Sequence, residues 1–151
     1  MSNSQAITTS FKREILAGIH ALGTTVVRPG TGADAIKAAL YLASASLGAT
    51  TTIYSATGEV TGTNYVAGGV AVTNANPPTT SGTTGYWNPS ADVVFTTVTI
   101  TSLFDAILFY NATQGNKSIC VCTFGQQTVT AGTLTINMPA SDSVNSLIRV
   151  N

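Results

Sequence analysis

Few groups in this sequence could carry out acid–base or nucleophilic chemistry. Six carboxylates are scattered along the chain, and no two have the spacing of a general acid/base pair. They are Glu14, Asp34, Glu59, Asp92, Asp105 and Asp142. The single histidine, His20, would have to serve any Ser-His-Asp triad, and no serine lies in a G-x-S-x-G motif. We therefore expect no catalytic residues and predict that the protein is not an enzyme.

The two cysteines, Cys120 and Cys122, are separated by one residue. On a β-strand this spacing places both side chains on the same face, where disulfide geometry is rarely met. A metal site would need further ligands, and His20 is distant in the sequence. We expect both cysteines to be small, buried residues of a reduced protein. The sequence predicts neither a metal site nor a cofactor.

The composition is poor in charge. Charged residues make up 8% of the 151 positions, and the net charge is zero, whereas about 25% is usual in soluble proteins. This balance argues against nucleic acid as a partner, because phosphate binding needs a basic excess. A membrane span is not expected, since no run of about 18 apolar residues occurs. The 26 threonines could cover the surface with neutral hydroxyls. The alternative, which we favour, is a subunit whose surface is covered by neighbours in an assembly.

Residues 4–22 have the periodicity of an amphipathic helix, and we treat 1–23 as an N-terminal helical segment. The apolar stripe recurs at every fourth position and comprises Ile7, Phe11, Ile15 and Ile19. Ser4 is the expected N-cap and Gly23 the expected end. Lys12 and Arg13 flank the stripe. We expect the stripe to close an open end of the β-domain near an oligomer interface, which makes these six side chains interface candidates.

Residues 34–151 have the pattern of a single β-domain. Short segments rich in Val, Thr and Ile are separated by Gly, Asn and Pro about every ten residues, which favours an antiparallel sandwich or barrel-like fold. The expected strands are 59–64, 65–74, 86–88, 93–99, 104–110, 117–124, 132–138 and 147–150. The segment 104–110 is expected to form a hairpin with 117–124. Residues 74–85 are interpreted as an exposed loop, whose role the sequence leaves open.

Residues 34–42 fit either a helix or a strand. Their alanine content favours a helix, whereas the surrounding β pattern favours a strand. We predict a strand. Tyr86 and Trp87 are two aromatic residues near expected loops. They are candidates for an interface or for the edge of the core. A stacking platform for sugars is the alternative interpretation of this pair.

With these elements placed, the sequence resembles a family of small virion structural proteins of tailed bacteriophages. The matching stretches are Phe11–His20, Asp34–Tyr41, Ala49–Tyr54, Gly58–Gly69, Ala106–Asn111 and Leu147–Val150. Gly58–Gly69 is the most distinctive of them. The resemblance covers most of the chain, although not the region around Pro77 and Pro78. It also supports a strand over a helix at 34–42.

The resemblance implies a component of the virion, assembled in the host cytoplasm. Within that family, a capsid decoration or cement protein is the role we expect. Its partners would be the major capsid protein or other virion proteins, and it would form a homo-oligomer, for which a trimer is plausible. A tail or head-fibre attachment component is the alternative. A carbohydrate-binding β module using Tyr86 and Trp87 is the alternative from another class of protein.

Overall fold

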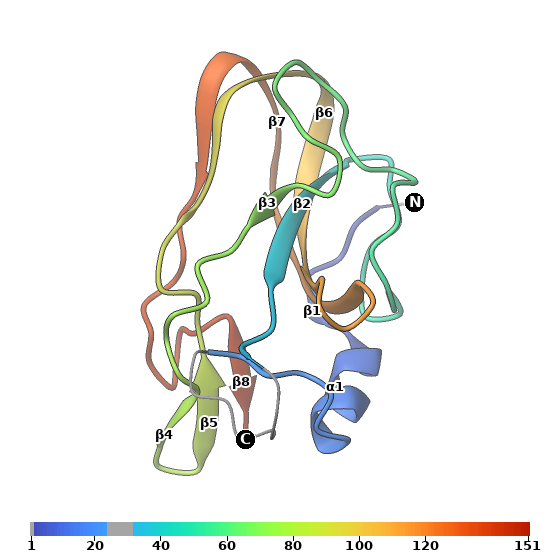
Figure 1. The fold of residues 1–151 in the computed structure, drawn as a ribbon. Coiled ribbons are helices and arrows are strands. Elements are labelled where there is room, and N and C mark those ends of the chain that lie inside the picture. Colours follow the sequence, from blue (N-terminus) through green and yellow to red (C-terminus); the bar gives the residue numbers. More distant parts are fainter. Residues whose placement is uncertain (1, 24–31) are drawn as a thin grey trace.

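The computed structural model describes residues 2–23 and 32–151. The described chain is mainly β, and its strands form a five-stranded antiparallel sheet in the order β1-β7-β6-β2-β3 and a three-stranded sheet in the order β4-β5-β8 (Figure 1). The elements are β1 (Ala6–Ile7), α1 (Thr9–Leu16), β2 (Ile36–Leu42), β3 (Val70–Ala71), β4 (Thr79–Ser81), β5 (Thr84–Trp87), β6 (Val93–Asn111), β7 (Lys117–Ile136) and β8 (Ile148–Val150). The predicted class, a mainly β, sandwich-like fold with one N-terminal helix, is confirmed, and the sheets do not close into a barrel.

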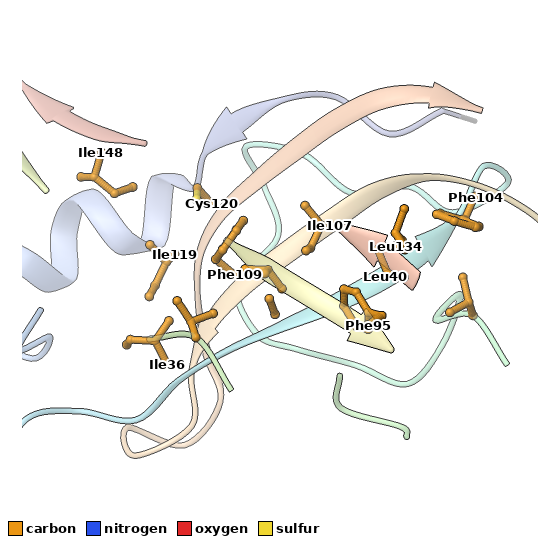
Figure 2. Packing of buried hydrophobic residues seen from close by; sticks show 14 of the residues in the cluster. Ile36, Leu40, Phe95, Phe104, Ile107, Phe109, Ile119, Cys120, Leu134 and Ile148 are labelled. Atoms are coloured by element: carbon orange, nitrogen blue, oxygen red, sulfur yellow. The ribbon is translucent and has the colours of Figure 1, made fainter. Parts of the chain in front are cut away.

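A single long hairpin, β6–β7, dominates the fold. The strands are 19 and 20 residues long, and shifts of register between Phe95 and Ala106 mark a series of bulges. Bulges bend a strand and increase its twist, and the hairpin curls over at that end (Figure 1). Phe95 and Phe109, from opposite halves of β6, consequently meet in one hydrophobic core (Figure 2). The hairpin of 104–110 with 117–124 was predicted, but 93–99 and 132–138 were expected as separate short strands. They are instead parts of β6 and β7, and β7 runs without a break through the residues between 124 and 132.

The centre of the larger sheet is buried on both faces. Along β2, Ala38 and Leu40 belong to the main core, whereas Ala39 and Tyr41 belong to a second cluster on the opposite face. The strand predicted at 34–42 is therefore confirmed, since β2 pairs with β6 over its whole length. A strand covered on both faces can be apolar at every position, and for this reason its sequence showed no clear alternation.

The helix is shorter than the predicted span of 4–22. Ala6 and Ile7 form β1 and pair with β7, and the hydroxyl of Thr8, not of Ser4, caps the helix by accepting from the Phe11 N–H. The helix ends at Leu16, and Gly18 follows with φ +67°, a conformation that glycine adopts without strain. Ile19 consequently lies outside the helix. The strand pairing of residues 6–7 outweighed the helical periodicity.

The two strands predicted across residues 59–74 are largely wrong. Only Val70 and Ala71 form a named strand there, supplemented by the isolated bridges of Glu59 with Tyr41 and of Thr63 with Thr99. Gly68 and Gly69 both have positive φ values, which interrupts extended structure. In the expected loop 74–85, residues 79–81 form β4 and pair with β5. The strands predicted at 86–88 and 147–150 are present as β5 and β8.

Candidate functional site

Four of the predicted interface residues, distant in sequence, line one cavity. Phe11 and Ile15 of α1 meet Tyr86 and Trp87 of β5 around a space of about 340 Å³. The other lining residues are His20, Leu22, Pro78, Thr79, Thr80, Gly85, Ile148 and Val150. The walls are mostly apolar because α1 presents its apolar stripe to the three-stranded sheet. This cavity is the candidate functional site, because residues that were selected from the sequence meet in it.

The lining residues differ in how much surface they offer. Phe11 is 1% exposed and Trp87 2% exposed, so both are core residues of this chain. The Trp87 indole N–H donates to the Asn76 carbonyl at 3.1 Å, which fixes the ring. Ile15 and Tyr86 are half-buried. Of these four predicted residues, Ile15 and Tyr86 therefore supply the accessible surface of the wall.

The remaining predicted interface residues lie outside the cavity lining. Ile7 is in β1 and half-buried, and Ile19 is half-buried beyond the end of α1. Lys12 and Arg13 are exposed on the outer side of α1. The helical stripe is therefore covered by the chain's own core at Phe11, Ile7 and Ile15, whereas the basic flank faces solvent.

The sequence analysis missed a buried polar cluster that fastens α1 to the β6–β7 hairpin. Glu14 is 2% exposed, and its two carboxylate oxygens bind Lys117 Nζ and His20 Nε2, each at 2.9 Å. Burial acts to raise the pKa of Glu14, but the hydrogen bonds from Lys117 and His20 and the charge of Lys117 outweigh it. The pKa consequently lies below its ordinary value. His20, which the sequence analysis considered only for a catalytic triad or a metal site, is a buried partner of this carboxylate.

The amide of Asn111 determines which ring nitrogen of His20 accepts a hydrogen bond. Asn111 Oδ1 accepts from the Gln114 N–H at 3.1 Å, and Nδ2 donates to Asp34 Oδ2 at 2.8 Å. The same Nδ2 lies 3.0 Å from His20 Nδ1. An amide nitrogen can only donate, so Nδ1 must be the acceptor and Nε2 must carry the proton that is shared with Glu14. The His20 ring therefore links the helix to the end of β6.

A second buried carboxylate, Glu59, organises the covering loops. It accepts hydrogen bonds from Tyr54 Oη at 2.6 Å, Tyr65 Oη at 2.7 Å and the Gly68 N–H at 2.8 Å. Burial and the hydrogen bond to this carboxylate raise the pKa of both Tyr54 and Tyr65 well above the ordinary value. Tyr110 adds a hydrogen bond to the Gly68 carbonyl at 2.7 Å. The signal in the sequence was the pair of tyrosines on either side of Glu59, Tyr54 and Tyr65.

These two clusters connect α1 and the covering loops to the large sheet. The oxygens of Glu14 and Glu59 are occupied by donors from the chain itself. Within residues 2–23 and 32–151, no three His, Cys, Asp or Glu side chains are grouped so that they could hold a metal ion. Cys120 is buried as expected, whereas Cys122 is half-exposed, and both are free thiols. No helix of the described chain is long and apolar enough to cross a membrane.

Fold and site together define a charge-poor β-sandwich-like domain whose buried carboxylates act as structural fasteners. No family model, no curated protein and no solved structure matches the chain.

Proposed function

We propose that this protein is a structural subunit of a tailed-bacteriophage particle, bound to the outside of the head as a decoration protein. The observation that carries the proposal is how few charges reach the surface. Of the charged residues in 2–23 and 32–151, only Lys12, Arg13, Asp92 and Arg149 are exposed. Lys37, Asp105, Lys117 and Asp142 are half-buried, and Glu14, Asp34 and Glu59 are buried. A free protein with so neutral a surface would tend to associate, and a lattice subunit uses that tendency.

The architecture of this domain suits a subunit that makes the phage head stiffer. Both faces of the central sheet are covered, and the two carboxylate clusters fasten α1 and the covering loops to the sheet. Rigid surfaces lose little conformational entropy on association, which favours binding. We infer that the protein acts by bridging neighbouring capsid proteins as a homo-oligomer, with a trimer as the form to test first, in virions assembled in the host cytoplasm.

The surface around the outer side of α1 is the contact we propose. Lys12 and Arg13 are exposed there, and Leu16 is 89% exposed at the end of the helix. Tyr86 lies across the cavity from this helix. An exposed leucine between basic residues and a half-buried tyrosine has the apolar-centre and polar-rim composition of an interface.

The alternatives differ in support. A tail or head-fibre attachment component would need the same rigid, neutral surface, so it remains the second candidate within the virion. A carbohydrate-binding module needs an exposed aromatic face. With Trp87 2% exposed, only Tyr86 of the predicted pair could provide one, and we therefore favour the assembly role.

Heat resistance of particles tests the proposal. Phage particles that lack the protein should lose infectivity at a lower temperature, and adding back the purified protein should restore resistance. Leu16→Glu should fail to restore it, because it charges the proposed contact. Thr128→Glu, which adds the same charge on the exposed part of β7, should restore it fully. Particles of unchanged heat and osmotic resistance without the protein would contradict a decoration role.

A further inference from the structure

A second cavity, distinct from the one between α1 and β5, lies beside the edge of the large sheet. This groove of about 550 Å³ has Gln5, Ala6 and Ile7 along one side and the chain leaving β7, including Asn137, along another. Cys122 and Leu147 also line it. Among its lining residues, Arg149 is the only one with a charged side chain. The groove is bounded by two stretches of extended backbone. The hydrogen-bonding groups of these two stretches that have no partner determine what the groove can bind.

On the first side, the backbone of Ile7 points into the groove. The Thr8 N–H donates to the Ile119 carbonyl of β7 at 3.0 Å. Successive N–H groups of an extended chain point to opposite edges, so the N–H and C=O of Ile7 face away from β7. In the part of the chain that the structure describes, β1 pairs with β7 alone. One backbone donor and one acceptor of Ile7 are therefore available to a neighbouring strand.

The other side repeats this arrangement. The Met138 N–H donates to Asp92 Oδ1, just before β6, at 2.7 Å. Burial alternates between exposed and covered residues from Thr133 to Met138, which shows that the chain stays extended beyond β7. The N–H and C=O of Asn137 therefore point away from β6, towards the groove that this residue lines. No hydrogen bond to the backbone of Asn137 occurs within residues 2–23 and 32–151.

The space between these edges matches a short strand. With a rise of about 3.3 Å per residue, a strand spacing of about 4.8 Å and a sheet spacing of about 10 Å, one extended residue fills roughly 160 Å³. The groove volume thus corresponds to about three or four residues. We propose that this groove binds an extended segment of another protein as an added β-strand, which pairs with Ile7 on one side and Asn137 on the other.

The lining also sets the character of that segment. Because Arg149 alone carries a charge there, the segment should be largely neutral, with small or apolar side chains on the face that meets Cys122 and Leu147. Main-chain hydrogen bonds supply affinity in strand addition, and pockets for alternate side chains supply selectivity. This inference stands apart from the proposed virion role, because it depends only on the two backbone edges.

A tethered strand tests the groove in the full-length protein. Asn151 lines the groove, so a Thr-Val-Thr-Val-Thr segment can be appended through a flexible linker of about six residues, which spans roughly 13 Å. The extension should raise Tm by about 5 °C and slow amide hydrogen exchange at Ile7 and Asn137 by at least about tenfold. A Thr-Pro-Thr-Pro-Thr extension, whose prolines remove every N–H along one edge of the added strand, should do neither. Equal Tm and exchange for the two extensions would overturn the proposal.

Two variants examine the pairing itself. Asn137→Pro removes the N–H that faces the groove and should abolish the rise in Tm, whereas Asn137→Ala retains that N–H and should preserve the rise. Amide hydrogen exchange at Ile7 in the protein that carries the Thr-Val-Thr-Val-Thr extension tests the pairing without any substitution at Asn137.

Sedimentation of the protein without an extension identifies the source of the strand. If the chain associates with itself, and Asn137→Pro abolishes this association while Asn137→Ala retains it, the occupant is a second copy and the assignment to another protein is overturned. A monomer, or association that neither variant changes, supports the assignment to another protein.

Discussion

His20 Nδ1 accepts a hydrogen bond from Asn111 Nδ2 at 3.0 Å, although 91 positions separate the two residues. This contact joins the segment after α1 to the last residue of β6. Asn111 is 0% exposed, and its amide is held on the other side by Asp34. The N-terminal segment is thereby part of the folded domain, not a separate arm.

The first prediction concerns which ring nitrogen of His20 carries a proton. At neutral pH, ¹⁵N NMR should show a protonated Nε2 and an unprotonated Nδ1. Asn111→Asp puts an acceptor in place of the donor and should shift the proton to Nδ1 or favour the doubly protonated ring. A wild-type ring protonated at Nδ1 would show that the hydrogen bond to Asn111 is wrongly assigned.

Glu14→Gln should destabilise the protein by about 1–3 kcal/mol at pH 7, because Lys117 and His20 lose a charged acceptor. The folded pKa of Glu14 is below its ordinary value of 4.5. The unfolded chain therefore binds the proton first as the pH falls, and this stabilisation is present above about pH 4.5 and lost below it. Urea unfolding between pH 3 and 7 should show a smaller loss of stability in acid for Glu14→Gln than for the wild type.

Lys12→Gln is the matched control for that experiment. Lys12 is exposed on the same helix, so the change should alter the free energy of unfolding by less than about 0.5 kcal/mol at any pH. If both variants showed the same acid dependence as the wild type, the account of Glu14 would be wrong.

Tyr65→Phe should cost about 1–3 kcal/mol, because one hydroxyl serves two buried groups. It donates to Glu59 and accepts from the Leu40 N–H at 3.0 Å. Tyr86→Phe removes a hydroxyl that has no hydrogen bond within the described chain, so it should be nearly neutral. Chemical denaturation measures both, and equal effects would contradict the role given to the Glu59 cluster.

Gly69→Ala should be among the most damaging single substitutions. A Cβ at this position would lie 1.8 Å from the Ala38 carbonyl oxygen of β2, and φ is +68°. Gly115 has nearly the same φ, +69°, but nothing within 4 Å of its Cβ position. Gly115→Ala should therefore cost only the backbone strain of about 1–2 kcal/mol, whereas Gly69→Ala should lower the yield of folded protein or cost several times more. Similar Tm values for the two variants would argue against the close approach of Gly69 to β2.

The β elements were predictable where local pattern and tertiary pairing agree. Residues 104–110 and 117–124 carry apolar side chains and are joined by a turn containing Gly115, so the hairpin could be inferred. The helix limits could not, because Ile7 fits the helical stripe as well as it fits β1. Sequence periodicity cannot weigh a hydrogen bond to β7 against one more helical turn.

The polar clusters were beyond sequence reasoning for a similar reason. Glu14 and Lys117 are separated by 103 positions, and nothing local marks either as buried. The cavity could be predicted in part. Four of its lining residues were selected from the sequence as interface candidates: Phe11, Ile15, Tyr86 and Trp87. That selection identified large apolar side chains near chain ends and loops, but it could not tell that Phe11 and Trp87 are covered by their own chain.

The most direct test of the central claim is a cryo-electron microscopy reconstruction of the phage particle, compared with particles that lack this protein. The decoration role predicts difference density on the outer surface of the head, at symmetry-related positions, into which the β6–β7 hairpin and α1 fit with the outer side of the helix towards the capsid. Density confined to the tail would move the protein to the attachment role. No difference between the two particles would contradict a structural role in the virion.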